Sequence, residues 1–146
     1  MNTISELAVK KFEASYNCAQ SVLWAFTDEF GIDSDVLLRI SCGFGGGISR
    51  RQEMCGAVSG AIMALGLRYG QGEGKGRSFT ENTYTKTTEF IKRFEAIHGS
   101  CCCKILLQDA DLATQEGKDF VAANNLREKV CKCCVRTAVE IVEELL

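Results

Sequence analysis

Proline is absent from this chain of 146 residues, and histidine and tryptophan each occur once. Proline interrupts helices because it lacks a backbone N–H donor and its ring clashes with the preceding turn. Its absence, together with apolar residues at helical spacing in nearly every segment, favours helix throughout. We therefore expect an all-α protein, a single-domain helical bundle of about five to seven helices that spans residues 1–146.

Long apolar runs and a charge excess of one sign are missing as well. No apolar run approaches the roughly 20 residues of a membrane-spanning helix, and MNTISELAVKKFEASYN lacks the apolar core of a secretory signal. Seventeen Lys and Arg against 19 Asp and Glu give a net charge of -2, which offers nothing to attract nucleic acid or an anionic membrane. We expect a cytoplasmic protein with no nucleic-acid partner and no membrane insertion.

The chain is too poor in cysteine for a secreted disulfide scaffold, in which cysteines exceed about 8–10% of residues. It nevertheless has nine, an odd number that argues against a fully paired framework. In a reducing compartment structural disulfides are rare, and clustered thiols serve metal binding or redox chemistry. The cysteines are therefore the candidate functional residues.

Apolar spacing and capping residues predict where the helices lie. The expected helices are SELAVKKFEASY with Thr3 or Ser5 as N-cap, a second from Asn17 to Gly31, and DSDVLLRIS opened by Asp33 or Ser34. Further along we expect QEMCGAVSGAIMALGLRYG as the central helix, SFTENTYTKTTEFIKRFEAIHG ending near Gly99, CCCKILLQ capped by Ser100, and LREKVCKCCVRTAVEIVEELL. GQGEGKG is predicted as a loop, and residues 109–125 as loop with a helical turn or two.

Three cysteine positions fall at predicted helix starts. Cys18 follows Asn17, Cys55 follows the glycine turn GFGGG, and Cys101 to Cys103 follow Ser100. Unpaired N–H groups and the positive end of the helix dipole favour a thiolate there and lower the thiol pKa. Arg50 and Arg51 are expected to add positive charge near Cys55.

The last helix contributes a fourth position. Cys131 shares its core-facing side with Val135, and Cys134 lies about one turn on, so both can point at a common centre. Cys133 falls on the polar side and is expected to be exposed. Cys131 and Cys134 form a C-x-x-C pair, which alone only suggests a metal or redox site.

A cysteine on an apolar helix face is more often inert filler than a nucleophile or ligand. That structural interpretation is favoured for Cys42, and it balances the functional one for Cys101, Cys102, Cys133 and Cys134. The placement at helix starts and the large number of cysteines together favour the functional interpretation for Cys18, Cys55, Cys103 and Cys131. The single histidine, His98, is expected to interact with the C-terminus of its helix rather than act as a base or ligand.

The order of Cys18, GFGGGISR, CGAVSGAIMALGLRYG, HGSCCCKILL and a cysteine before VRTAVEI resembles the C-GCAxxG-C-C family, to which a redox role is ascribed. The resemblance extends over about residues 12–146 and implies a helical fold with four defining cysteines, carried onto Cys18, Cys55, Cys103 and Cys131. Members of the family are often encoded near transporters. The additional cysteines of this chain blur which thiol of each cluster is the functional one.

The leading hypothesis is a redox-active protein in which Cys18, Cys55, Cys103 and Cys131 converge and perform thiol/disulfide exchange as catalytic residues. The alternative is an iron–sulfur cluster or another metal held by the same four thiols, with Cys134 as an additional candidate ligand. A third hypothesis is a non-catalytic accessory or metal-delivery partner of a transporter. We also expect a redox partner protein as a possible partner. A homodimer could form through the glycine side of the central helix, at Gly56 and Gly60.

Overall fold

Helices account for nearly all regular structure in the computed structural model, which describes residues 1–146 and has no strand. The α-helices are α1 (Ile4–Glu13), α2 (Cys18–Trp24), α3 (Thr27–Phe30), α4 (Ser34–Ser41), α5 (Gly45–Ile48), α6 (Gly56–Tyr69), α7 (Arg77–His98), α8 (Cys103–Leu106), α9 (Gln115–Ala123) and α10 (Lys132–Leu145). A 3-10 turn, η1 (Cys42–Phe44), precedes α5, and a π-helical turn, η2 (Arg127–Cys131), leads directly into α10. The all-α prediction is confirmed. The predicted number of helices was too low because α3, α5 and α8 are single turns of four residues.

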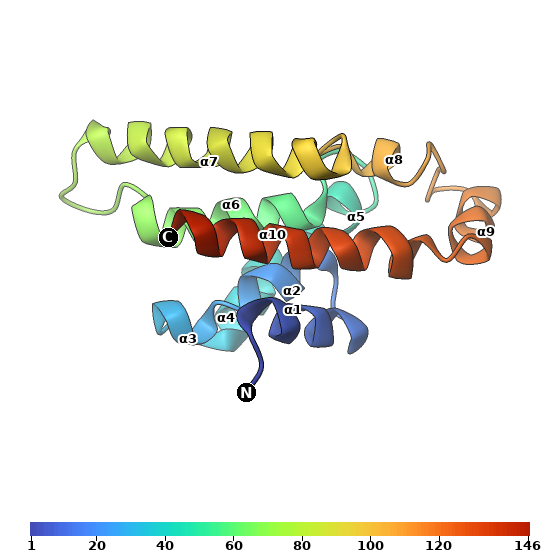
Figure 1. Cartoon of the computed structure of the whole chain (residues 1–146), viewed down its shortest axis with the longest axis horizontal. Helices are drawn as coiled ribbons and strands as arrows, with labels where there is room; N and C mark the ends of the chain where they lie inside the picture. Colours follow the sequence, from blue (N-terminus) through green and yellow to red (C-terminus); the bar gives the residue numbers. More distant parts are fainter.

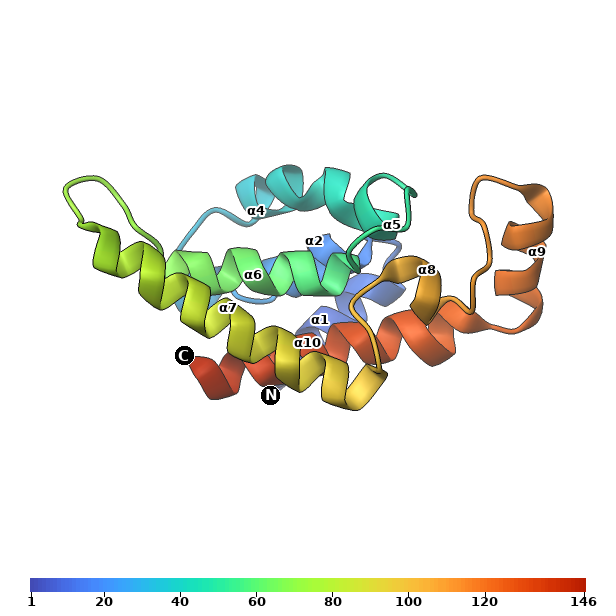
Figure 2. The same cartoon turned by 90° about the horizontal axis from the view of Figure 1, so that it is seen from above.

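The helices form layers around the pair α6 and α10 (Figure 1). The long helix α7 covers one side of this pair, and α1, α2 and α4 lie on the other (Figures 1 and 2). The short helices α8 and α9 lie at one end of the bundle, beyond the end of α7 (Figure 2). None of the helices has both the length and the apolar character needed to cross a membrane.

Apolar side chains from every long helix meet in one core. The largest fully buried side chains are Phe26, Phe90, Phe94, Leu23, Leu37, Leu65, Val22, Val58, Val135, Val139, Val142 and Cys134. Burial of each such side chain contributes about 1.5–3 kcal/mol relative to exposure. The core therefore fixes α10 against α6 and α7, and with it the position of Cys134.

The predicted N-caps of the first two helices are confirmed. Thr3 Oγ1 accepts from the backbone N–H of Glu6 at 3.2 Å, and Asn17 Oδ1 accepts from that of Gln20 at 2.9 Å. Both form capping boxes, in which the third helical residue reaches back to the cap N–H. The Asn17 amide also donates to the carbonyl of Cys42 at 2.9 Å, which joins the start of α2 to the glycine turn.

Other predicted boundaries were wrong. The second helix does not run unbroken to Gly31 but stops at Trp24, and α3 follows as a separate turn that ends at the left-handed Gly31. Ser100 caps no helix; its hydroxyl accepts from the N–H of Cys102 at 2.9 Å within a turn, and α8 starts only at Cys103. Residues 109–125, predicted as mostly loop, contain the nine-residue α9.

The glycines of α6 allow α2 to approach closely. A Cβ atom added to Gly60 would lie 2.7 Å from the carbonyl oxygen of Ala19, and one added to Gly56 would collide with Sγ of Cys18. Gly56 and Gly60 are therefore covered within the monomer, which favours core packing over a dimer formed through this glycine side. Their absence of a side chain instead brings α2 and its cysteine against the start of α6.

We predict that Gly60→Ala destabilises the protein by about 1–3 kcal/mol, because backbone atoms of α2 would have to move away. Gly66→Ala is the matched control in the same helix, since an added Cβ there meets nothing within 4 Å. That control should stabilise by up to about 1 kcal/mol through helix propensity. Urea denaturation of both variants measures the difference, and equal midpoints would contradict the close packing of α2 on α6.

Candidate functional site

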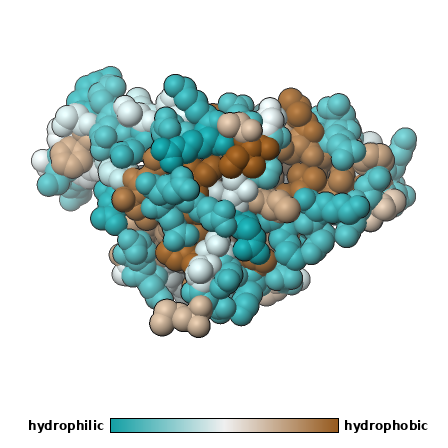
Figure 3. Space-filling model, in the orientation of Figure 1, coloured by the Kyte–Doolittle hydropathy of each residue, from teal (hydrophilic) through white to brown (hydrophobic).

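A cavity of about 450 Å³ lies at the end of the bundle where the starts of α2, α6 and α8 meet η2. Six of the nine cysteines line it: Cys18, Cys42, Cys55, Cys103, Cys131 and Cys134. The cavity thus brings together the predicted site residues Cys18, Cys55, Cys103 and Cys131. On the outside, a brown hydrophobic patch lies toward the end that carries α8 and α9 (Figure 3).

A left-handed turn carries the chain from η1 to Cys55. Gly46 and Gly47 have φ values of 66° and 65°, and Ile48 follows with φ 67°, which is rare for a β-branched residue. A Cβ at Gly47 would lie 2.7 Å from Cβ of Cys103. The glycine run of the sequence therefore does more than end a helix, because it lets the backbone pass directly beside a cavity thiol.

Gln52 fastens this turn to the segment that carries Cys103. Its buried amide donates to the carbonyl of Ala110 at 2.6 Å and accepts from the N–H of Leu112 at 2.8 Å. The N–H of Cys103 donates to the carbonyl of Glu53 at 2.7 Å. The sequence analysis missed Gln52, since a single glutamine in a polar stretch carries no pattern that reports such long-range bonds.

The pKa of the Cys55 thiol is lowered. The main cause is the thiol of Cys134, which donates a hydrogen bond to the Cys55 sulfur; the backbone N–H groups of Ala57 and Val58 at the start of α6 act in the same direction. Burial opposes these effects because it penalises the charged form. Cys55 is therefore the thiol best able to exist as a thiolate, and Cys134, whose pKa is raised by the same hydrogen bond, stays protonated.

The predicted lowering of the pKa by helix starts was wrong for Cys18 and Cys103. Both are the first residue of a helix, but burial raises the pKa of Cys18 to about 11 and that of Cys103 to about 12. Burial likewise raises the pKa of Cys131 to about 12. In each case the charge of a neighbouring thiolate adds to the effect, so a thiolate at Cys55 keeps its neighbours neutral.

The two arginines expected near Cys55 differ in where they lie. Neither Arg50 nor Arg51 is among the causes of the lowered pKa of Cys55. Arg51 lies 3.7 Å from a carboxylate oxygen of Glu53 and away from the cavity wall, whereas Arg50 is part of that wall. Arg127, which was not predicted from the sequence, also lines the cavity. Its positive charge partly opposes the rise in the pKa of Cys131 that burial causes.

The remaining cysteines divide by exposure. Cys42 is exposed and lines the cavity, and its structural interpretation stays a prediction. Cys133 is exposed as predicted, Cys101 is buried, and Cys102 is half-buried; none of these three lines the cavity.

The single histidine is the last residue of α7 and contacts both α10 and the last turn of its own helix. The ring of His98 lies 2.9 Å from the hydroxyl of Thr137 and 4.8 Å from the ring of Phe94, and burial lowers its pKa. His98 is absent from the cavity wall. It supplies no base to the thiols.

No group of three or more His, Cys, Asp and Glu side chains is arranged so that it could hold a metal ion. The cavity thiols as placed therefore do not fit a single bound ion. The predicted ligand role of Cys18, Cys55, Cys103 and Cys131, with Cys134, stays a prediction.

Comparison with protein families adds to this geometry. Residues 16–145 match the model of the family described as "Putative redox-active protein (C_GCAxxG_C_C)". The chain belongs to the C-GCAxxG-C-C family. The match covers nearly the whole chain, as the resemblance predicted, and includes every cysteine of the cavity. No curated protein and no solved structure matched the chain.

In this member of the C-GCAxxG-C-C family, we predict that Cys134→Ala raises the pKa of Cys55, because it removes the donor that stabilises the thiolate. Alkylation of Cys55 by iodoacetamide at neutral pH should slow several-fold, and its pH profile should move to higher pH. Peptide mass spectrometry across a pH series measures this. Cys133→Ala, one position earlier on the same helix and exposed, is the control and should leave the profile unchanged.

Proposed function

We propose that this protein is a thiol/disulfide redox protein in which Cys55 is the attacking thiolate and Cys134 the resolving thiol. The observation that supports this most is that Cys55 and the buried Cys134 line the same cavity, in which the side chain of Cys134 lowers the pKa of Cys55. An attacking thiol needs thiolate character, access and a resolving partner. The start of α6 and the side chain of Cys134 give Cys55 thiolate character. The cavity gives access to it, and Cys134 is its resolving partner.

The proposed reaction begins when the Cys55 thiolate attacks one sulfur of a substrate disulfide. A bond forms between Cys55 and that sulfur, the substrate S–S bond breaks, and the other substrate sulfur leaves as a thiolate. Cys134 then loses its proton to solvent or to the departing thiolate and attacks the Cys55 sulfur. The bond between Cys55 and the substrate breaks, and the remaining substrate sulfur leaves as a second thiolate. The products are a Cys55–Cys134 disulfide and the reduced substrate, so two electrons pass from the protein to the substrate. An external dithiol of the redox pool would restore the reduced protein.

The charge of Cys55 determines when Cys134 can act. The hydrogen bond to Cys55 is the largest cause of the raised pKa of Cys134, and the Cys55 charge contributes as well. Both influences disappear once Cys55 is bound in a mixed disulfide, since that sulfur is then neutral. The pKa of Cys134 falls at the stage that requires it to be a nucleophile.

Cys18, Cys103 and Cys131 would take a secondary part as catalytic thiols. They are protonated while Cys55 is a thiolate, because burial and its charge both oppose their ionisation. After Cys55 and Cys134 have formed a disulfide, these neighbours can pass electrons to it by further exchange. The cavity would then hold more than one dithiol equivalent.

The test is mild oxidation of anaerobically purified protein, followed by blocking of free thiols and mapping of the disulfide-linked peptides. We predict loss of thiols in pairs and a first crosslink between the peptides of Cys55 and Cys134. Cys55→Ser should abolish that crosslink and its fast phase, whereas Cys133→Ser should leave both intact. A first crosslink that excludes Cys55 would contradict the proposal.

Metal and labile-sulfide analysis of the same preparation separates the alternatives. A colourless protein without stoichiometric metal agrees with exchange. Iron and sulfide with visible charge-transfer bands that disappear in Cys55→Ser would instead assign the thiols to a cluster. Stoichiometric metal without exchange activity would favour the metal-delivery hypothesis.

A further inference from the structure

Apart from the Cys55 thiolate, the charged side chains on the cavity wall all have the same sign. Among the residues that line the cavity, Arg50 and Arg127 are the charged side chains, and the wall contains no Asp, Glu or Lys. The whole chain has 19 acidic residues against 17 basic ones. The positive wall is therefore a local feature that the overall composition does not predict.

Arg50 offers an unpaired positive charge at the rim. It is exposed, and no carboxylate lies within salt-bridge distance of it, in contrast to its neighbour Arg51 beside Glu53. The left-handed turn holds it there, with φ of 65° and its N–H bonded to the carbonyl of Gly45 at 3.3 Å. The backbone thus adopts an unfavourable conformation at the position that carries a free guanidinium.

Arg127 is held more firmly on the opposite wall. Its guanidinium lies 4.0 Å from the ring of Phe12 and donates to the carbonyls of Phe12 at 3.4 Å and Tyr16 at 3.3 Å. None of these partners carries a negative charge. Stacking and carbonyl bonds therefore fix its direction and leave its charge available.

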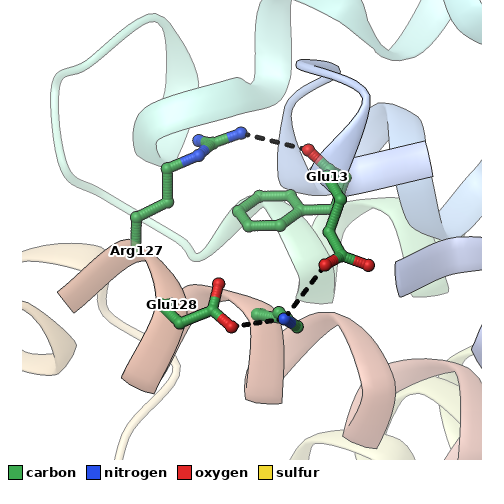
Figure 4. Close-up of polar contacts among 5 residues, drawn as sticks. Glu13, Arg127 and Glu128 are labelled. Carbon is green, nitrogen blue, oxygen red and sulfur yellow. Dashed lines mark hydrogen bonds and ion pairs between the residues drawn. The ribbon is translucent and has the colours of Figure 1, made fainter. Parts of the chain in front are cut away.

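The nearest carboxylates are engaged elsewhere. Figure 4 shows the Arg127 guanidinium directed away from the carboxylates of Glu13 and Glu128, which converge on the ammonium of Lys132. Glu13 and Glu128 line a neighbouring hollow that Arg127 also borders, and they do not line the cysteine cavity. Inside the cavity the field of Arg127 is thus not cancelled by an acidic side chain on the wall.

The rest of the wall is mostly apolar, and the cavity has the size of a small-molecule site. Leu106, Leu107, Leu112, Val121 and Val130 contribute to it. A volume of about 450 Å³ falls within the roughly 300–1,000 Å³ of small-ligand pockets. Cys55 itself is only 7% exposed, so a compact disulfide can reach it more easily than a disulfide in a folded protein surface.

We propose that the cavity accepts a small anionic disulfide, or the corresponding thiol, whose carboxylate pairs with Arg50 and Arg127 while its sulfur meets Cys55. This inference rests on the proposed function, because it names the substrate class of the same exchange reaction. The arginines act as binding residues. They offset the repulsion between an anionic substrate and the Cys55 thiolate, which a cavity without cations could not do.

The test compares two aromatic disulfides, dianionic dithiobis(nitrobenzoate) and neutral dithiodipyridine. In each reaction Cys55 displaces one aryl thiolate from the reagent, Cys134 displaces the second, and the protein loses two electrons as its disulfide forms. The rate that is compared is that of the kinetic phase of aryl thiolate release that is missing in Cys55→Ser. Each variant is compared with wild type on the same reagent, so differences in intrinsic reagent reactivity cancel.

Arg50→Gln should slow the Cys55 phase with the dianionic reagent by about 3- to 10-fold, and should leave the rate with the neutral reagent within about twofold. Arg50→Lys should restore most of the loss, and added salt should reduce it because exposed charges are screened. Arg51→Gln is the matched control, since Arg51 is exposed, adjacent and outside the cavity wall.

Equal slowing of both reagents by Arg50→Gln, or no slowing of either, would overturn the anionic substrate class while leaving thiol exchange intact. An equal effect of Arg51→Gln would overturn it too, because the charge would then act from the general surface. If Cys55→Ser removes no phase with either reagent, the proposed function itself fails. The two failures are therefore distinguishable in one set of traces.

Discussion

The close contact between α2 and α6 is the constraint on which the site depends. Because Gly56 and Gly60 have no side chains, the backbone of α2 passes directly over the start of α6. Cys18 then lies against Gly56, one residue from Cys55. The same contact closes one wall of the cavity, so packing and chemistry at this end of the bundle depend on one pair of glycines.

Burial raises the pKa of a thiol, whereas nearby hydrogen-bond donors lower it. The balance between these two effects differs from one cysteine to the next. At Cys18 and Cys103 the desolvation of a thiolate outweighs the N–H groups of a helix start. At Cys55 a hydrogen bond from Cys134 reverses the balance. Only one negative charge is favoured at a time, since a thiolate at Cys55 raises the pKa of the others around it. The cavity therefore concentrates sulfur without accumulating charge.

Much of the fold and part of the site could be predicted from the sequence. Periodicity and the caps Thr3 and Asn17 predicted the first helices, and the glycine turn located Cys55 at the start of α6. The sequence did not predict that Cys134 would be the partner of Cys55, because that contact depends on how α10 packs against α6. Nor could it reveal Gln52 or Arg127. Their bonds to Ala110 and Tyr16 join segments far apart in the chain, and no local spacing reports them.

The π-helical turn at the start of the last helix lets the core-facing side of α10 and the direction of Arg127 be set separately. A π turn contains one residue more than an α turn, so a residue at its start is rotated by about 100° about the axis of the following helix, compared with its place in an unbroken α-helix. Val135 and Val139 can thus take the orientation that the core needs, while Arg127 takes the one that its stacking on Phe12 needs. The extra residue sets the rotation of Arg127 relative to the buried side of α10. A chain one residue shorter here could keep the valines of α10 in the core and yet direct the guanidinium elsewhere.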